Sequence, residues 1–345
     1  MNISCLIVNQ PLSPHVVNMK SDLTMKAAIS ERYGPPEIVE IRDVPKPTPK
    51  AGEVQVKVHA TTVTRTDCGM RTPYPFFVRP FIGLFRPRIT ILGLDFAGVV
   101  EAVGDDVALF KPGDRVFGMS PTRYGAHSEY LCIAEKAWIA TMPISVECAD
   151  AVLCEGAWYA NANLEKYGMH AGDKILIFGG GGAIGSAAIQ LAKFYGAEVT
   201  SVIEPRHIEL VKSLGADHII DFTQTDFSQS RKMYDFVFDS VGKTSYSKCK
   251  KILEPGGTFS ATDLGPFGQN IWLSLCSRIR RNRRVIFPLP ISSKSVIEFI
   301  KARIEAGELR AIIDSRHPLE NIVEAYSRVD TEQKTGIVVI DVVKP

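Results

Sequence analysis

A group of closely spaced glycines gives the clearest chemical signal in this chain. Gly180, Gly182 and Gly185 have the spacing of a dinucleotide-binding loop, in which backbone N–H groups can approach a pyrophosphate closely. The apolar run 174–178 precedes them, and helical periodicity follows over 184–195. A strand, a glycine turn and a helix N-terminus together favour bound phosphate. The predicted phosphate-binding residues are Gly179, Gly180, Gly182, Ala183, Ile184 and Gly185.

Glycine runs also form ordinary turns, so the flanking sequence has to support this interpretation. Short apolar runs at 197–203, 217–221, 234–239 and 257–262 alternate with helical patterns. Strands that alternate with helices predict an α/β fold with a doubly wound parallel sheet. Val241 follows the run 234–239 and Thr262 ends the run 257–262, and both complete the predicted cofactor-binding set.

Length and composition indicate a globular protein of about two domains. The chain has 345 residues, with 40 basic and 38 acidic side chains and a formal net charge of +2. This balance gives no reason to expect a nucleic-acid partner. Seven cysteines are scattered without the short spacing of a zinc knuckle. Free thiols in a chain of this length suggest a reducing compartment, and we predict a cytoplasmic location.

The first 24 residues are predicted to be a mobile extension. Their apolar run, 5–8, is too short to span a bilayer and has no basic residue before it, so a secretory signal is not expected. The segment also lacks arginine, which a transit peptide would contain. No transmembrane segment is expected.

The sequence pattern of residues 25–148 predicts mainly β strands. Strands are predicted at 25–29, 39–41, 53–58, 95–103, 115–118 and 126–133. Apolar and polar residues alternate at Val54, Val56 and Val58, and prolines and glycines separate the runs. A small, twisted antiparallel barrel is the natural prediction.

Several motifs together resemble the medium-chain dehydrogenase/reductase superfamily, and within it the quinone oxidoreductase branch. They lie at residues 33–36, 45–49, 92–104, 110–116, 125–130, 179–185 and 214–217. The resemblance implies a GroES-like β-barrel catalytic domain over 25–150 and 291–345. It implies a Rossmann domain that binds NAD(P) over 151–290.

The resemblance also allows a test for zinc, which needs Cys, His or carboxylate ligands at fixed positions. Threonine stands at the first ligand position, Thr64, and leucine at the second, Leu94. The four-cysteine loop of a structural zinc is absent too. We therefore expect no metal, and hydride transfer that relies on hydrogen bonds alone to polarise the substrate.

Three polar residues are the predicted catalytic candidates: Thr64, Asp67 and Asp95. Each has a structural alternative. Thr64 could cap a turn, Asp67 could cap a short helix, and Asp95 could hydrogen-bond buried backbone. Gly69 stands where related reductases often carry a tyrosine, which leaves the proton donor unassigned.

The choice of cofactor receives conflicting signals. Glu204 lies at about the distance from the glycines at which an acid binds the ribose of NAD, whereas Arg206 could bind the 2′-phosphate of NADP. Counting back from the motif at 214–216, the acid of NAD-using relatives would fall on the apolar Val202, and Arg206 matches the arginine of NADPH reductases. We predict NADPH, with NADH as the alternative.

Two basic stretches admit further interpretations. The aromatic and proline-rich stretch 74–88 is predicted to be an apolar lid over the substrate, with a membrane-surface contact or a buried loop as alternatives. The arginines of 278–284 are interpreted as a solvated helix end rather than a nucleic-acid site. The run 285–289 resembles the edge strand through which these proteins pair their sheets, which predicts a homodimer.

The sequence therefore predicts a zinc-independent NAD(P)H-dependent oxidoreductase that reduces a quinone, enone or aldehyde. Its partner would be a small apolar carbonyl compound or quinone. Two alternatives stay open: a metal-free NAD(P)-dependent alcohol dehydrogenase, and a dinucleotide-binding protein whose task is binding RNA or a membrane.

Overall fold

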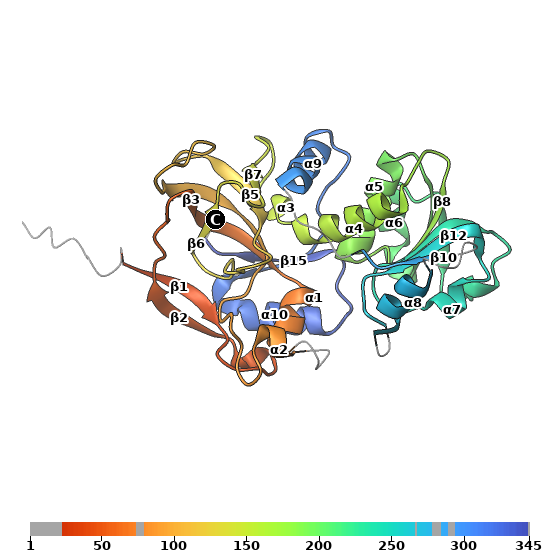
Figure 1. Ribbon diagram of the computed structural model, residues 1–345, viewed down its shortest axis with the longest axis horizontal. Coiled ribbons are helices and arrows are strands. Elements are labelled where there is room, and N and C mark those ends of the chain that lie inside the picture. The colour runs from red at the N-terminus through yellow and green to blue at the C-terminus, as the bar shows by residue number, and fades with distance from the viewer. Residues whose placement is uncertain (1–22, 74–78, 266–267, 278–283, 289–293, 344–345) are drawn as a thin grey trace, which may run out of the picture.

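Two β-sheets lie side by side in the computed structural model of the protein, with α3 (Cys148–Ala151) and α4 (Cys154–Tyr167) between them (Figure 1). The structure describes residues 23–73, 79–265, 268–277, 284–288 and 294–343. The predicted extension therefore lies almost wholly outside the described residues.

The first sheet has seven strands, β14-β15-β3-β4-β5-β7, with β6 also paired to β3. Its pairs are antiparallel except for β14 with β15, which come from the C-terminal part of the chain. A separate antiparallel pair, β1 and β2, adjoins it. The bounds are β1 Thr24–Ile29, β2 Glu40–Pro45, β3 Glu53–Val63, β4 Asp95–Val103, β5 Arg115–Met119, β6 Tyr130–Ala134, β7 Ile139–Thr141, β14 Ile313–Pro318 and β15 Ile337–Asp341.

The alternation along β3 explains the core of this part of the molecule. Val54, Val56 and Val58 are fully buried and pack with Phe96 and Val116 of the neighbouring strands. Each burial removes apolar surface from water and stabilises the fold by roughly 1.5–3 kcal/mol. The predicted barrel strands are thus confirmed, although 126–129 precede β6 as an irregular segment that holds only an isolated bridge, Ala27 with Ser128.

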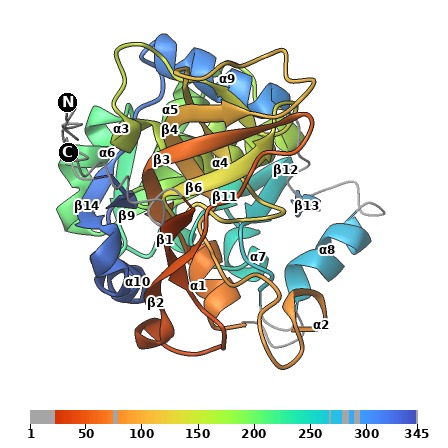
Figure 2. The ribbon, with the colours of Figure 1, turned by 90° about the vertical axis from the view of Figure 1, so that its left-hand side faces the viewer.

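Short helices surround this sheet. In both Figure 1 and Figure 2, α1 (Arg65–Arg71), α2 (Arg79–Ile82) and α10 (Ile322–Asp330) lie on its lower side. The 3₁₀ helices η1 (Pro36–Ile38) and η6 (Leu319–Asn321) belong to the same part. Helix α9 (Lys294–Glu305) runs across the top of both views and packs on α4 and β7.

The second sheet has six strands, β10-β9-β8-β11-β12-β13, and all its pairs are parallel. Its strands are β8 Lys174–Phe178, β9 Glu198–Ile203, β10 His218–Asp221, β11 Tyr234–Asp239, β12 Leu253–Ala261 and β13 Arg284–Ile286. The intervening helices are α5 Ala183–Phe194, η3 Pro205–His207, α6 Ile208–Ser213, η4 Phe227–Gln229, α7 Tyr246–Cys249 and α8 Gln269–Ser277.

The apolar run of β8 is continuous because both faces of the sheet are covered. Ile175 and Ile177 join a core with α4 and α5, whereas Leu176 joins the core on the other face with Val237 and Phe259. The first of these cores also contains Ala97 of the barrel sheet, so one apolar core connects the two sheets.

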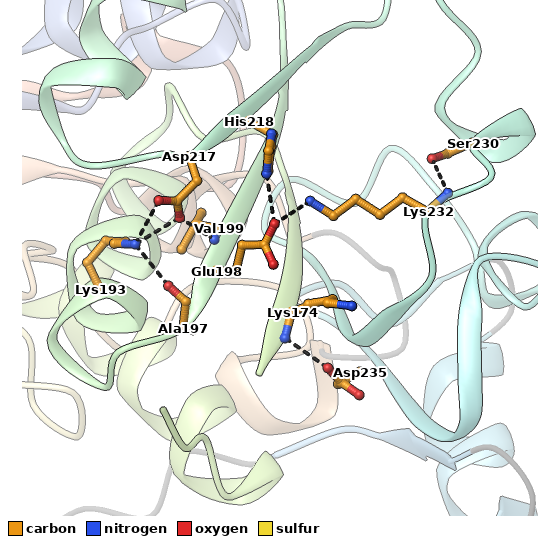
Figure 3. A network of polar contacts seen from close by, with 10 residues as sticks. All are labelled: Lys174, Lys193, Ala197, Glu198, Val199, Asp217, His218, Ser230, Lys232 and Asp235. Carbon is orange, nitrogen blue, oxygen red and sulfur yellow. Dashed lines mark hydrogen bonds and ion pairs between the residues drawn. The ribbon is translucent and has the colours of Figure 1, made fainter. Parts of the chain in front are cut away.

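A polar network fixes the amino ends of the parallel strands (Figure 3). Lys193 Nζ contacts Asp217 Oδ2 at 2.8 Å, and the same carboxylate oxygen accepts the Val199 N–H at 2.8 Å. Glu198 Oε1 receives His218 Nε2 and Lys232 Nζ, each at 2.7 Å. These contacts lie at the edge opposite the carboxyl ends of the strands, where α/β sheets bind ligands.

No helix in the described part of the chain combines the length and apolarity that crossing a bilayer requires.

Candidate active site

The glycine loop joins β8 to α5 at the carboxyl edge of the parallel sheet. Gly179 has a φ of +86°, which an L side chain rarely adopts, and it turns the chain out of β8. A Cβ on Gly185 would stand 2.2 Å from the Gly179 carbonyl oxygen, so only glycine allows the helix to approach the strand. At Gly182 a Cβ would meet no protein atom within 3.5 Å. A side chain at Gly182 would thus clash with no protein atom at its Cβ, which leaves room beside the first turn of α5 for a phosphate; we call this place the phosphate cradle.

Helix α5 begins at this open side with its amide groups available. Gly182 is its N-cap residue, and none of the described side chains caps the first turn. The Ser186 N–H bonds to the Gly182 carbonyl at 2.9 Å, so the helix is formed from its start. Ala183, Ile184 and Gly185 thus occupy the first turn, where helix N–H groups and the helix dipole favour an anion.

Asp239, at the end of β11, organises the loops beside the cradle. Its Oδ1 accepts the Val241 N–H at 3.1 Å and the Gly242 N–H at 2.9 Å, and its carbonyl accepts the Thr262 N–H at 3.1 Å. Val241 also lies over the glycine loop, because a Cβ on Gly179 would stand 2.5 Å from its Cγ1. The fold thus brings the predicted residues Val241 and Thr262 to the edge that carries the glycines.

Arg206 and Glu204 lie just beyond β9 and pair with each other. Arg206 Nε contacts Glu204 Oε2 at 2.8 Å, and both side chains are more than a third exposed. An exposed pair of this kind is worth only about 0.2–1 kcal/mol, so Arg206 can leave it for a phosphate. Glu204, which would favour NAD, and Arg206, which would favour NADP, therefore lie side by side.

A loop from the C-terminal part of the chain closes over the cradle. The Gly336 N–H donates to the Gly181 carbonyl at 2.8 Å, and Thr335 Oγ1 lies 2.9 Å from His207 Nε2. Glu332 pairs with Arg65 at 2.9 Å and with Lys243 at 2.5 Å. The loop therefore connects α1 of the barrel part with the segment that follows β11.

Thr64 and Asp67 form a capping box at the start of α1. Asp67 Oδ2 accepts the Thr64 N–H at 2.9 Å and the Thr64 hydroxyl at 2.8 Å, while Oδ1 accepts the Gly93 N–H at 2.9 Å. The Thr64 hydroxyl in turn accepts the Asp67 N–H at 3.1 Å. Thr64 therefore caps α1, and its hydroxyl also hydrogen-bonds the Glu155 carboxylate, while Asp67 serves as the third helical residue rather than as the cap itself.

Asp95 is fully buried at the start of β4. Its Oδ1 accepts the Glu155 N–H at 3.0 Å, and its Oδ2 accepts the Thr62 hydroxyl at 3.3 Å. Burial, followed by the nearby Glu155 carboxyl, holds the pKa of Asp95 well above its usual value. Asp95 thus holds buried backbone in place, the role that its structural alternative describes.

The sequence analysis did not identify three polar residues that lie beside Asp67 and Asp95: Thr66, Glu155 and Lys334. Glu155, in the first turn of α4, is buried, and its carboxylate accepts the hydroxyl of Thr66. Burial raises the pKa of Glu155 to about 7. Lys334 lies on the other side, in the C-terminal loop, and burial lowers its pKa to about 8. The one available signal was a single acid in the otherwise apolar run 151–158.

The donor set at this place does not suit zinc. The two expected ligand positions hold Thr64 and a buried Leu94, and both carboxylate oxygens of Asp67 are occupied by N–H and O–H donors. Over the described ranges, no group of three or more His, Cys, Asp or Glu side chains has the arrangement of a metal site. Zinc needs three or four such ligands.

Two aromatic side chains of the stretch 74–88 are exposed in the part that the structure describes. Phe81 of α2 is 78% exposed and Phe85 is 86% exposed, so the buried-loop alternative is wrong for these residues. Phe76 and Phe77 lie outside the described residues, as do the arginines of 278–283. Arg284 begins β13, which pairs with β12 at the edge of the parallel sheet and agrees with the expected edge strand.

Comparison with known proteins shows the family to which the chain belongs. Residues 50–144 match the alcohol dehydrogenase GroES-like domain, and residues 214–340 match a family described as zinc-binding dehydrogenase. The chain is 30% identical over 331 residues to 2-methylene-furan-3-one reductase of Solanum lycopersicum, covering 92% of this chain and 79% of that protein. The chain belongs to the medium-chain dehydrogenase/reductase superfamily, in its quinone oxidoreductase-like branch.

Two further members of this superfamily are similar over most of their length. NADPH-dependent alkenal/one oxidoreductase of Arabidopsis thaliana, a chloroplastic protein, is 29% identical, with 94% of this chain and 82% of that protein covered. The structure of the quinone oxidoreductase from Coxiella burnetii superposes with a TM-score of 0.83 at 25% identity and covers 93% of this chain and 100% of that chain. The superfamily fold, a GroES-like part and a Rossmann-like parallel sheet, is therefore confirmed.

Proposed function

We propose that this protein is an NADPH-dependent oxidoreductase that reduces a quinone or an α,β-unsaturated carbonyl compound without zinc. The observation that carries the proposal is the meeting of three segments at the open glycine loop. They are the first turn of α4 against Ala183, the C-terminal loop at Gly181, and Val241 beyond β11. This cradle suits a dinucleotide, whose reactive ring would then lie toward α1 and α4.

The residues of the cradle have separate tasks in this proposal. The first turn of α5 binds the pyrophosphate through its N–H groups, and Arg206 binds the 2′-phosphate. Val241 and Thr262 border the path toward the barrel part. When bound, NADPH supplies the hydride, and the protein supplies orientation, water exclusion and a proton.

The substrate class follows from the chemistry at the barrel side. The donor set there offers hydroxyls and carboxyls instead of a Lewis acid, so the acceptor has to be electrophilic already. Quinones and enones meet this condition better than simple ketones do, and aldehydes are weaker candidates. The names of the tomato and Arabidopsis relatives agree with this class. The exposed Phe81 would contact the apolar part of such a substrate.

Three further features belong to the same proposal. The catalytic part comprises residues 25–150 and 291–345, and the Rossmann part comprises 151–290; the pairing of β15 with β3, and of β14 with β15, supports this division. The edge strand β13 would pair with a second copy to form a homodimer. We also infer a cytoplasmic location from the cysteine usage, although the Arabidopsis relative is chloroplastic.

A panel of acceptors tests the proposal directly. Purified protein should consume NADPH with small quinones and enones, and more slowly or not at all with saturated ketones. Oxidation of primary or secondary alcohols with NADP⁺ at a higher rate would favour the metal-free alcohol dehydrogenase. Tight NADPH binding without turnover of any acceptor would favour a binding protein.

A further inference from the structure

Glu155 occupies an unusual position for an acidic side chain. It lies in the first turn of α4, it is 7% exposed, and its N–H is fixed on Asp95 Oδ1 at 3.0 Å. Its carboxylate oxygen Oε1 accepts the hydroxyl of Thr66, which belongs to α1. The carboxyl group of Glu155 therefore joins the two helices that face the cofactor cradle from the barrel side.

The neighbours of Glu155 place it beside the cradle. A Cβ on Gly156, the next residue, would stand 2.9 Å from the Ala183 carbonyl oxygen at the start of α5. Lys334 faces the carboxyl from the C-terminal loop, two residues before Gly336, whose N–H bonds to Gly181. Both charged residues are thus held against the glycine loop by backbone contacts.

Thr66 gives this buried acid a route to the outside. Unlike Glu155, Thr66 is partly exposed, and its hydroxyl contacts the Glu155 carboxylate and the Tyr159 phenol. A hydroxyl of this kind can accept a proton from one side and release its own on the other.

We propose that Glu155 is the proton source of the reduction and acts through the hydroxyl of Thr66; this inference rests on the proposed function. A hydride forms a new C–H bond on the substrate, and the electron pair of the reduced double bond moves to the carbonyl oxygen. Thr66 gives its hydroxyl proton to that oxygen, and Glu155 gives its own proton to Thr66. Glu155 is left as a carboxylate and takes a proton from water.

The charges around Glu155 suit this task. Burial raises its pKa to about 7, Asp67 favours its protonated form, and the Thr66 and Thr64 hydroxyls and Lys334 favour its charged form. A proton donor works best when its pKa lies near the working pH. The phenols of Tyr124 and Tyr159 also face this group, but burial raises the pKa of Tyr159 to about 12, which leaves Glu155 the stronger acid.

The other buried carboxyls nearby are less suited. Asp67 uses one oxygen to accept the Thr64 N–H at the start of α1 and the other to accept the Gly93 N–H before β4. Asp95 accepts the Glu155 N–H with one oxygen and the Thr62 hydroxyl with the other. Glu155 is thus the acid that a partly exposed hydroxyl connects to the cradle.

The first test compares Glu155→Gln with Glu155→Asp and with the control Glu135→Gln. Glu135 is also buried, but it accepts the Ala108 and Leu109 N–H groups at the barrel end of the molecule. E155Q should lower kcat by about 100-fold, E155D should retain part of the rate, and E135Q should match the wild type. NADPH affinity should change by less than about twofold in all three, since none of the side chains touches the glycine loop.

The pH profile separates a proton source from a structural group. Because the donor has to be protonated, the kcat of the wild type should fall as the pH rises through about 7. Lys334→Met removes the charge that lowers the pKa of Glu155, so this fall should move to higher pH. An E155Q protein that keeps the wild-type kcat and pH profile would overturn the inference, and so would a K334M profile that does not move.

Infrared difference spectroscopy provides a readout that does not need turnover. The wild type should show a carboxylic-acid C=O band that titrates near neutral pH and is missing in E155Q but present in E135Q. Absence of this band would also overturn the inference. A wild type that shows the band and binds NADPH but reduces no acceptor would refute the proposed function and, with it, the proton step. A wild type that reduces acceptors, together with an E155Q variant of unchanged activity, would refute only the role of Glu155.

Discussion

Gly185 stands so close to Gly179 that a Cβ on it would lie 2.2 Å from the Gly179 carbonyl oxygen, whereas a Cβ on nearby Gly182 would meet nothing closer than 3.6 Å. The two glycines therefore serve different purposes, although the sequence motif treats them alike. Gly185 allows the helix to pack on the strand, and Gly182 leaves room for the ligand.

This difference predicts that substitution of Gly182 affects NADPH binding, whereas substitution of Gly185 affects stability. Gly182→Val should leave the fold intact and raise the NADPH dissociation constant by about tenfold or more, because the new side chain enters the phosphate cradle. Gly185→Ala should lower the free energy of unfolding by about 1–3 kcal/mol through overpacking. Thermal unfolding and fluorescence titration of both variants measure these effects. Unchanged NADPH affinity in G182V would show that the phosphates bind elsewhere.

The sequence predicted the strands best where packing leaves little choice. The expected ranges 95–103, 174–178 and 234–239 match β4, β8 and β11 residue for residue. These strands are buried on both faces or at their centres, so apolar runs mark them clearly. Helix α5 spans Ala183–Phe194, shifted by one residue from the helical periodicity over 184–195, because its first residue belongs to the glycine-rich loop by composition.

The site was harder to predict than the fold, because its polar groups meet only in three dimensions. Thr64 and Asp67 have capping-box spacing, which a sequence shows, but their occupation by N–H and O–H donors needs coordinates. Glu155, Thr66 and Lys334 come from three distant segments. A lone acid in an apolar run signals a buried carboxyl and does not reveal its partners.

The metal content of the protein provides a second prediction. Since Thr64 and Leu94 cannot replace zinc ligands, purified protein should contain well under one zinc per chain and keep its activity in a chelator. Metal analysis together with an activity assay after dialysis against the chelator tests this. About one zinc per chain, with activity lost on its removal and restored on its return, would contradict the zinc-free proposal.

The third prediction concerns Phe81, an exposed aromatic residue of the predicted lid. Phe81→Ala should raise KM for bulky acceptors more than for small ones, and it should barely change the melting temperature, because Phe81 is 78% exposed. Phe96→Ala is the matched control, since Phe96 is fully buried and its loss should cost about 3–5 kcal/mol of stability. Equal KM values for all acceptors in the F81A protein would remove Phe81 from the substrate path.

The last prediction concerns the choice between NADPH and NADH. Arg206 is held by Glu204 at 2.8 Å in a largely exposed pair, so binding a 2′-phosphate has to overcome only a weak interaction. Arg206→Ala should raise the NADPH dissociation constant by about tenfold to a hundredfold, the worth of a charge-assisted contact, and leave NADH nearly unchanged. Glu204→Ser should increase the preference for NADPH, because it removes both the competing partner and a repelling charge. Titrations of both variants with both cofactors, at one salt concentration, measure the preference. Equal losses for the two cofactors in the R206A protein would mean that Arg206 supports the loop and does not recognise the phosphate.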